Sequence, residues 1–292
     1  MAGLKEIRNR IASVKSTRQI TSAMKMVSAA KLKKSQDRIT QIKPYAAKLV
    51  DVLIEVSSSL DKEHKGIFNE ERNQENVLIV LMASNRGLCG AFNSNICKAA
   101  ISHVQNNYPE QAKSNKVKFL TIGKKAGEFI RKQNFEIIKS ADYIYDNSNF
   151  ESVAKISEYL MQLFADKVFD RIDLVYNSFK NAALQIQTIE QFLPMTVNRN
   201  ERTNPSEYIF EPNLNEILEE VIPKALKIQF FKAILDTSAA EHGARMTAMH
   251  QATDNATNMI HELTLEYNKA RQAAITKEIL EIVSGAEALK SR

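Results

Sequence analysis

The sequence has few of the residues that interrupt helices. Only eight Gly and six Pro occur among 292 residues, below the usual shares of about 7% and about 5%. Because Gly and Pro are the strongest local breakers of regular structure, their scarcity predicts long helices. The length favours about two domains, and the hydrophobic content of 44% is sufficient for a packed core.

Long apolar runs and a secretory signal are also missing. The longest apolar run, "VLIVLMA" at 77–83, suits one buried strand and is far short of the ~20 residues of a membrane span. The basic amino terminus never reaches the apolar stretch of a signal peptide. Two cysteines, Cys89 and Cys97, fit a reducing compartment better than a disulfide scaffold. We therefore expect a soluble cytoplasmic protein with two free thiols.

Positive charge is concentrated at the amino terminus. Residues 1–43 hold eleven Lys or Arg against Glu6 and Asp37, a net charge of +9, whereas the whole chain carries +6. The remaining residues therefore carry −3. This distribution predicts an acidic partner for the first segment: nucleic acid, an anionic membrane surface or an acidic protein groove.

The first 62 residues show the apolar spacing of a long coiled-coil helix. We expect one seam at the start of the segment, a displaced seam after it, and an unbroken seam at the end. Pro44 predicts a kink rather than an end, because the heptad phase continues across it. The three seams are Leu4, Ile7, Ile11 and Val14; then Ile20, Met24 and Val27; then Ile39, Ile42, Ala46, Leu49, Leu53, Val56 and Leu60.

The carboxy-terminal segment, 212–288, repeats this spacing at greater length. From Leu214, alternate steps of four and three reach Ala274, and fifteen of the eighteen positions are apolar. At ~1.5 Å per residue such a helix would span ~110 Å, so it needs another helix beside it. The positions are Leu214, Leu218, Val221, Ala225, Ile228, Lys232, Leu235, Ala239, His242, Met246, Met249, Thr253, Ala256, Ile260, Leu263, Tyr267, Ala270 and Ala274; Ile275, Ile279, Ile282, Ala286 and Leu289 add a final apolar repeat.

Residues 74–208 change to the pattern of a small α/β domain. "NVLIVLMAS" and "KVKFLTIG" are short apolar runs, each followed by a helical stretch at 94–107 and 124–133, as in parallel α/β units. "RIDLVYNSF" and "ALQIQTIEQFL" predict two paired strands. The fold class is therefore an antiparallel coiled coil of the terminal helices with an inserted Rossmann-like α/β domain.

Sites for chemistry are weakly indicated. "ASNRGLCGAFN" at 83–93 lies between a strand and a helix but lacks a phosphate-loop motif, so a tight turn is favoured over phosphate binding. "TIGKKAG" at 121–127 is weaker still. "HELTLE" at 261–266 has Leu265 where a zinc-protease helix needs its second His, and His242 is favoured as a register-setting residue over a ligand. We expect no cofactor, no metal and no catalytic residues.

The stretch 236–258 is dominated by Ala, Gly, Ser, Thr and Met. One hypothesis is a close helix–helix contact, because small side chains allow helix axes to approach closely. A second hypothesis is a smooth shaft that fits inside a collar of other chains.

The chain resembles the gamma subunit of the F-type rotary ATP synthase over nearly its whole length. The resemblance runs from "MAGLKEIRNRIASVKSTRQITSAMKMVSAAKLKKSQDRI" through "NRGLCGAFN" to "QATDNA" and "ITKEILEIVSGA". It implies a central rotor shaft of the bacterial type, without catalytic residues of its own. The implied partners are a ring of alpha and beta subunits, the epsilon subunit and the membrane c-ring, at the cytoplasmic face of the inner membrane as a peripheral protein.

The resemblance also implies contact and coupling residues. Met24 and Lys25 match the segment that faces an acidic loop of the beta subunit. The carboxy-terminal positions that match contacts to the ring are Arg271, Gln272, Thr276, Glu278 and Glu281. Solvation of a helix face is the alternative for each of them.

Two other functions remain open from the residues. A basic coiled-coil protein that binds nucleic acid would explain the charge of residues 1–43, but not the α/β insertion or the terminal helix. A nucleotide-using enzyme centred on Gly87 and Gly90 lacks recognisable catalytic residues. Co-purification of alpha and beta subunits would favour the rotor, and salt-sensitive DNA retention would favour the first alternative.

Overall fold

The computed structural model describes residues 2–58, 67–70, 72–145, 149–195 and 214–290. Its longest elements are the helices α1 (Ala2–Ser58) and α6 (Leu214–Lys290). Among the described residues, no helix has the length and apolar character needed to cross a membrane. The predicted boundaries at 62, 208 and 212 and the seam residue Leu60 lie outside the described residues, as do the side chains of Leu53, Val56, Leu214, Leu218 and Leu289.

The chain divides into two units that share these helices. The coiled-coil unit comprises Met1–Val27 and Met246–Arg292, and the α/β unit comprises Ser28–Arg245. Both α1 and α6 therefore contribute to each unit. Pro44 lies inside α1 and does not end it, as its position in the heptad phase predicts.

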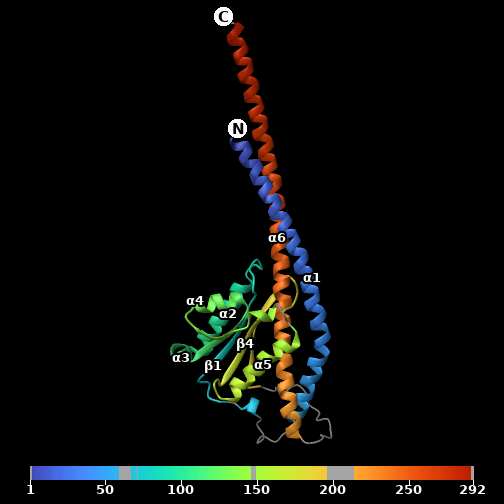
Figure 1. The fold of residues 1–292 in the computed structure, drawn as a ribbon, viewed down its shortest axis with the longest axis vertical. Helices are drawn as coiled ribbons and strands as arrows, with labels where there is room; N and C mark the ends of the chain where they lie inside the picture. Colours follow the sequence, from blue (N-terminus) through green and yellow to red (C-terminus); the bar gives the residue numbers. More distant parts are fainter. Residues whose placement is uncertain (1, 59–66, 71, 146–148, 196–213, 291–292) are drawn as a thin grey trace. The chain divides into compact units, whose positions relative to one another are not determined.

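A five-stranded sheet forms the centre of the α/β unit (Figure 1). Its strands are β1 (Val77–Met82), β2 (Val117–Ile122), β3 (Glu136–Ser140), β4 (Arg171–Phe179) and β5 (Gln185–Leu193), in the order β3-β2-β1-β4-β5. The pairs β1–β2, β1–β4 and β2–β3 are parallel, and β4–β5 is antiparallel. The strands predicted from 76–84, 116–123 and the two later runs are confirmed, whereas β3 was not predicted.

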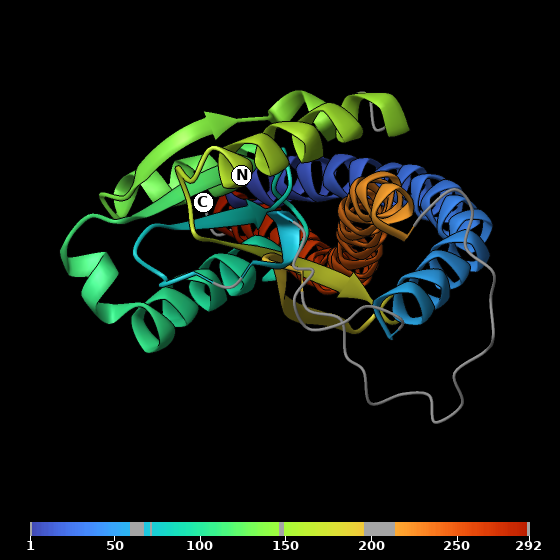
Figure 2. The same cartoon turned by 90° about the horizontal axis from the view of Figure 1, so that it is seen from below.

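Helices cover both faces of this sheet because side chains alternate along each strand. Val77, Ile79 and Leu81 of β1 pack with α2 (Phe92–Asn107) and α4 (Lys124–Lys132), which confirms the two predicted helical stretches. The alternate residues Leu78 and Val80 face α5 (Phe150–Ala165) and α6. Figure 2 shows α2 and α5 on opposite sides of the strands. The remaining elements are α3 (Pro109–Lys113), η1 (Ile67–Asn69) and η2 (Asp142–Tyr145).

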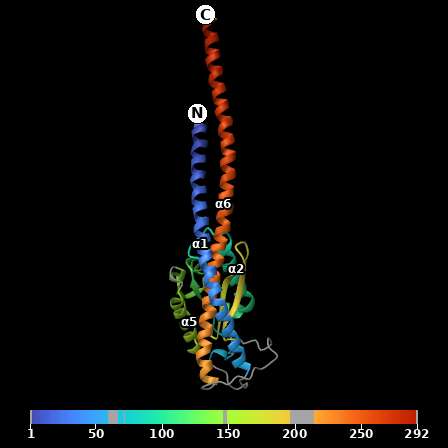
Figure 3. The same ribbon diagram turned by 90° about the vertical axis from the view of Figure 1, so that its right-hand side faces the viewer.

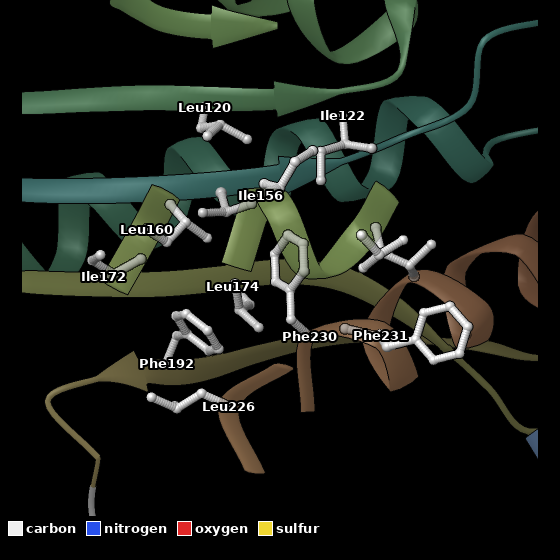
Figure 4. Close-up of a cluster of buried hydrophobic side chains, with 14 of the residues drawn as sticks. Leu120, Ile122, Ile156, Leu160, Ile172, Leu174, Phe192, Leu226, Phe230 and Phe231 are labelled. Atoms are coloured by element: carbon white, nitrogen blue, oxygen red, sulfur yellow. The ribbon is translucent and has the colours of Figure 1, made fainter. Parts of the chain in front are cut away.

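Helix α6 forms part of the larger core. Leu226 and Phe230 are fully buried beside Phe192 of β5, and the ring centroids of Phe192 and Phe230 are 5.8 Å apart (Figure 4). Phe231 lies at the edge of the same cluster. Burial of one large apolar side chain contributes about 1.5–3 kcal/mol. This part of α6 is therefore buried over a wide arc rather than a narrow seam.

The small residues of 236–245 allow α6 to approach the β4–β5 turn. A Cβ atom built on Gly243 would lie 3.2 Å from Ala182 Cα and 3.3 Å from a ring carbon of Phe179. Thr237 and Ala240 are fully buried. For this half of the 236–258 stretch, the structure supports close packing as the reason for small side chains.

Candidate functional site

The candidate functional site is the coiled-coil unit, because it contains all seven residues for which the resemblance implies contacts. Its helices lie side by side in Figures 1 and 3. Thr253 Oγ1 lies 2.8 Å from Thr21 Oγ1, and Lys25 Nζ lies 3.2 Å from His250 Nδ1. As residue numbers rise along α1, those of their partners on α6 fall. The pairing is therefore antiparallel, as predicted.

The predicted displaced seam of α1 is wrong at two of its three positions, and only Met24 is half-buried. Ile20 and Val27 are 60% and 57% exposed, whereas Thr21 is only 8% exposed. The heptad phase of Leu4 and Ile7 instead continues without displacement through polar residues. Its positions after Val14 are Arg18, Thr21, Lys25, Ser28, Leu32, Ser35, Ile39, Ile42, Ala46 and Leu49, and each is buried or half-buried.

The predicted seam of α6 is confirmed within this unit. Met249, Ala256 and Leu263 are at most 7% exposed, at spacings of seven residues. The intervening positions Thr253, Ile260, Tyr267, Ala270 and Ala274 are half-buried, and most residues between them are exposed. A stripe this narrow is the width expected for a helix packed against one partner helix.

Beyond Ala274, α6 has no buried stripe. All described side chains from 275 to 287 are exposed. Figures 1 and 3 both show α6 extending beyond the first residues of α1. The apolar side chains left exposed here are Ile275 (46%), Ile279 (55%), Leu280 (60%), Ile282 (72%) and Val283 (49%). We call residues 275–283 the apolar tip; contiguous exposed apolar groups of this kind mark binding surfaces.

The seven residues fall into two separate groups. Met24 and Lys25 are half-buried on α1, opposite His250. The second group lies on the exposed part of α6, about six to nine turns beyond His250 along that helix. It comprises Arg271, Gln272, Thr276, Glu278 and Glu281, all exposed. Glu281 lies 3.8 Å from Lys277 in an i,i+4 ion pair; the structure does not bring the two groups together.

The 83–93 loop is a tight turn that presents acceptors to α6. The carbonyls of Arg86 and Gly87 accept from the Arg245 guanidinium at 3.0 Å and 3.2 Å. Leu88 and Gly90 have φ values of +62° and +59°, the left-handed region that makes a sharp turn possible. Phosphate binding needs converging N–H donors, so this geometry favours the tight-turn interpretation.

Arg245 also forms a buried ion pair that sequence analysis missed. Its Nη1 lies 2.7 Å from Glu241 Oε1, and both side chains are 9% exposed. Burial raises the pKa of Glu241, and the Arg245 charge and hydrogen bond partly offset the rise. The i,i+4 spacing was visible in the sequence, but the loop that covers the pair is more than 150 residues away.

The other predicted features carry no visible chemistry. Cys89 and Cys97 are free and buried, and burial raises the pKa of Cys97 to about 12. His242 is half-buried. Its pKa is lowered to about 4, mainly by burial and further by nearby cations, so His242 is neutral at pH 7. His261 and Leu265 are exposed. Among the described residues, no group of three or more metal-ligating side chains occurs.

A buried polar cluster in the α/β unit was also missed. His103 Nε2 and the Tyr108 hydroxyl lie 2.9 Å and 2.6 Å from one oxygen of Asp173, and Arg171 Nε lies 3.0 Å from the other. Burial alone would raise the pKa of Asp173, but these partners outweigh burial and lower it. Because both carboxylate oxygens accept hydrogen bonds, the cluster connects α2 to β4 and does not present Asp173 as a general base.

Comparison with known proteins decides the family. A family model described as "ATP synthase" matches residues 3–289. Relatives named "ATP synthase gamma chain" from Christiangramia forsetii and Flavobacterium psychrophilum are 54% and 53% identical over 289 and 291 residues; these alignments cover 99% of this chain and 99% and 100% of the relatives. The chain belongs to the ATP synthase gamma-chain family. A relative from Geotalea daltonii is 44% identical over 292 residues, covering 99% of this chain and 100% of that one.

Solved structures share the fold of this gamma-chain family member. A chain of the Euglena gracilis mitochondrial ATP synthase, from the OSCP/F1/c-ring structure in rotational state 3, matches with a TM-score of 0.68 and 20% identity, covering 99% of this chain and 95% of that one. A central stalk/c-ring chain from Tetrahymena thermophila matches with a TM-score of 0.58 and 24% identity, covering 80% and 99%. At these identities the comparison concerns the fold.

Proposed function

We propose that this chain is the central rotor shaft of a bacterial F-type ATP synthase. It couples proton flow through the membrane rotor ring to ATP synthesis or hydrolysis in the ring of alpha and beta subunits. The match to gamma chains over almost the whole length supports this role. The nucleic-acid-binding alternative finds no support among these relatives.

The apolar tip is the observation that carries the proposal. A helix end with five exposed apolar side chains needs an enclosing partner, because burying that surface contributes roughly 25 cal/mol per Å². The ring of alpha and beta subunits supplies such an enclosure. In this arrangement Arg271, Gln272 and the exposed carboxylates beyond them form the polar contacts beside the tip.

The shaft acts by making different contacts in different orientations. A rotor can shift the conformational equilibrium of a ring subunit only through contacts that differ between its states. Met24 and Lys25 provide an adaptable apolar group and a charge for an acidic loop of the beta subunit. Nucleotide chemistry stays in the ring, and the 83–93 loop serves packing, because its Arg86 and Gly87 carbonyls accept hydrogen bonds from Arg245. The complex would work at the cytoplasmic face of the inner membrane, with epsilon and the c-ring as further partners.

Capture of the ring subunits tests the role of the apolar tip. The tagged full chain should co-purify with alpha and beta subunits, and Ile282→Asp should reduce their recovery, because Ile282 is 72% exposed in the isolated chain. Lys277→Gln is the matched control, since it makes the same change of charge in the same segment without removing an apolar side chain. Equal losses for both variants would contradict apolar enclosure of the tip.

A reversible crosslink tests rotation. Met24→Cys can be joined by a disulfide to a cysteine engineered in a beta subunit of the assembled complex, because the native Cys89 and Cys97 are buried. ATP hydrolysis should stop while the link is intact and recover after reduction. Full turnover with the link intact would show that the chain does not rotate against the ring.

A further inference from the structure

A single ring nitrogen on α6 faces both a donor and an acceptor. His250 Nδ1 lies 3.2 Å from Lys25 Nζ on α1 and 3.4 Å from Asp254 Oδ2 on its own helix. An ammonium group only donates hydrogen bonds, and an ionised carboxylate only accepts them. The one nitrogen can therefore serve Lys25 or Asp254, but not both in the same protonation state.

The proton on His250 selects between these two arrangements. In the neutral ring with hydrogen on Nε2, the Nδ1 lone pair accepts from Lys25, so the ammonium is held against α6. In the protonated ring, Nδ1–H donates to Asp254, and the imidazolium repels the Lys25 ammonium. Gain of one proton thus exchanges a bond between the two helices for one within α6.

We propose that His250 positions Lys25 and that protonation of His250 releases the Lys25 ammonium toward the partner. The proposal rests on the proposed function, in which Lys25 meets an acidic loop of the beta subunit. It adds a positioning residue on the opposite helix and a dependence of that contact on pH. Histidine is the side chain that ordinarily changes charge between pH 5 and 8.

Few charged side chains lie near His250 in the sequence of the two paired helices. In the coiled-coil unit, α1 is the helix that pairs with this part of α6. Between Arg18 and Val27 the charged residues of α1 are Arg18 and Lys25, and between Met246 and Thr257 the charged residue of α6 is Asp254. His250 and Asp254 side chains are 56% and 62% exposed, so protons reach the ring from solvent.

The test measures protons pumped per ATP hydrolysed by the whole complex in inside-out membrane vesicles, between pH 5.5 and 8. The parent is compared with His250→Gln, in which the amide oxygen can still accept a hydrogen bond from Lys25 but the side chain cannot gain a proton. We expect this variant to match the parent at pH 8 and to differ at pH 5.5 by about two- to fivefold, the range for exposed charged contacts. His250→Arg keeps a positive charge and should resemble the parent at pH 5.5 throughout.

Two further variants separate positioning from a structural effect. Asp254→Asn removes the acceptor of the protonated ring, so the transition should move to lower pH. Lys25→Gln removes the group that is positioned, so in that background exchange of His250 for Gln should change nothing. Parallel pH profiles for the parent and His250→Gln, or an undiminished His250 effect in Lys25→Gln, would overturn the proposal. Failure of the proposed function is distinct, because the chain would then not co-purify with alpha and beta subunits at any pH.

Discussion

Replacement of Arg245 with Met would leave a buried carboxylate without its partner. Arg245 and Glu241 are 2.7 Å apart with side chains 9% exposed, and Met retains much of the volume without the charge. Removing one member of a buried pair costs about 3–5 kcal/mol. The Arg86 carbonyl keeps the Ser84 hydroxyl as a donor at 2.6 Å, and Gly87 is exposed, so water can replace the guanidinium at its carbonyl. We therefore expect the free energy of unfolding to fall by about 4 kcal/mol.

The loss of stability in Arg245→Met should depend on pH, and the pKa of Glu241 determines whether it grows or shrinks as pH rises. Burial raises the pKa of Glu241 in the folded chain, and Arg245 offsets part of the rise. Without Arg245 the pKa rises further. A folded-state pKa above the unfolded value gives stability that is present below the unfolded pKa and lost as pH rises through the folded pKa. Arg245→Met should therefore destabilise less at pH 5 than at pH 8.

A double variant isolates the pair from the packing of the side chains. Glu241→Gln removes the charge that Arg245 compensates, so the double variant should be more stable than Arg245→Met alone, with an interaction energy of about 2 kcal/mol. Urea unfolding of the full chain, followed by circular dichroism at both pH values, measures the differences. A loss below about 1 kcal/mol at pH 8 for Arg245→Met, or a double variant as unstable as the single one, would refute the reasoning.

Three further predictions concern other parts of the chain. Burial raises the pKa of Asp236 to about 6; the Lys232 charge opposes this rise and the Glu190 charge adds to it. Asp236→Asn should therefore raise the free energy of unfolding at pH 8 by about 2–3 kcal/mol and leave it unchanged below about pH 4. Urea titration at both pH values measures the difference. Leu263→Asp should destabilise by about 3 kcal/mol or more because Leu263 is 6% exposed, whereas Leu265→Asp, at a position 50% exposed, should have little effect on thermal melting. Two thiols should titrate after denaturation without reductant, and none would indicate a disulfide between Cys89 and Cys97.

The α6 seam was predictable because most of its positions are apolar. Met249, Ala256 and Leu263 repeat every seven residues, and a count of apolar side chains detects them directly. The middle of the α1 seam contains Thr21 and Lys25, which a count of apolar side chains rejects. Apolar residues one position earlier were therefore assigned to the interface, although burial follows the uninterrupted phase.

The missed contacts connect residues that are distant in sequence. Thr21 and Thr253 form a hydrogen bond across a sequence separation of 232 residues, and Arg245 donates to Gly87 across 158 residues. Hydroxyl pairs and guanidinium–carbonyl bonds have no periodicity that a single sequence displays. The strand β3 was missed for a local reason, because "EIIKS" at the edge of the sheet is short and only partly buried.

The exposure of α6 changes along its length in three steps, from the core of the α/β unit, through the pairing with α1, to an end whose described side chains are exposed. From Ile222 to Arg245 the helix is buried over a wide arc, because it packs in the core of the α/β unit. From Thr253 to Ala274 only a heptad stripe is covered, because one helix lies beside it. From Ile275 onward no described side chain is covered, although apolar residues persist. Persistence of apolar residues after the partner helix has ended is costly in water, so the last segment is explained by a partner outside this chain, and a mutation there should affect assembly before it affects folding.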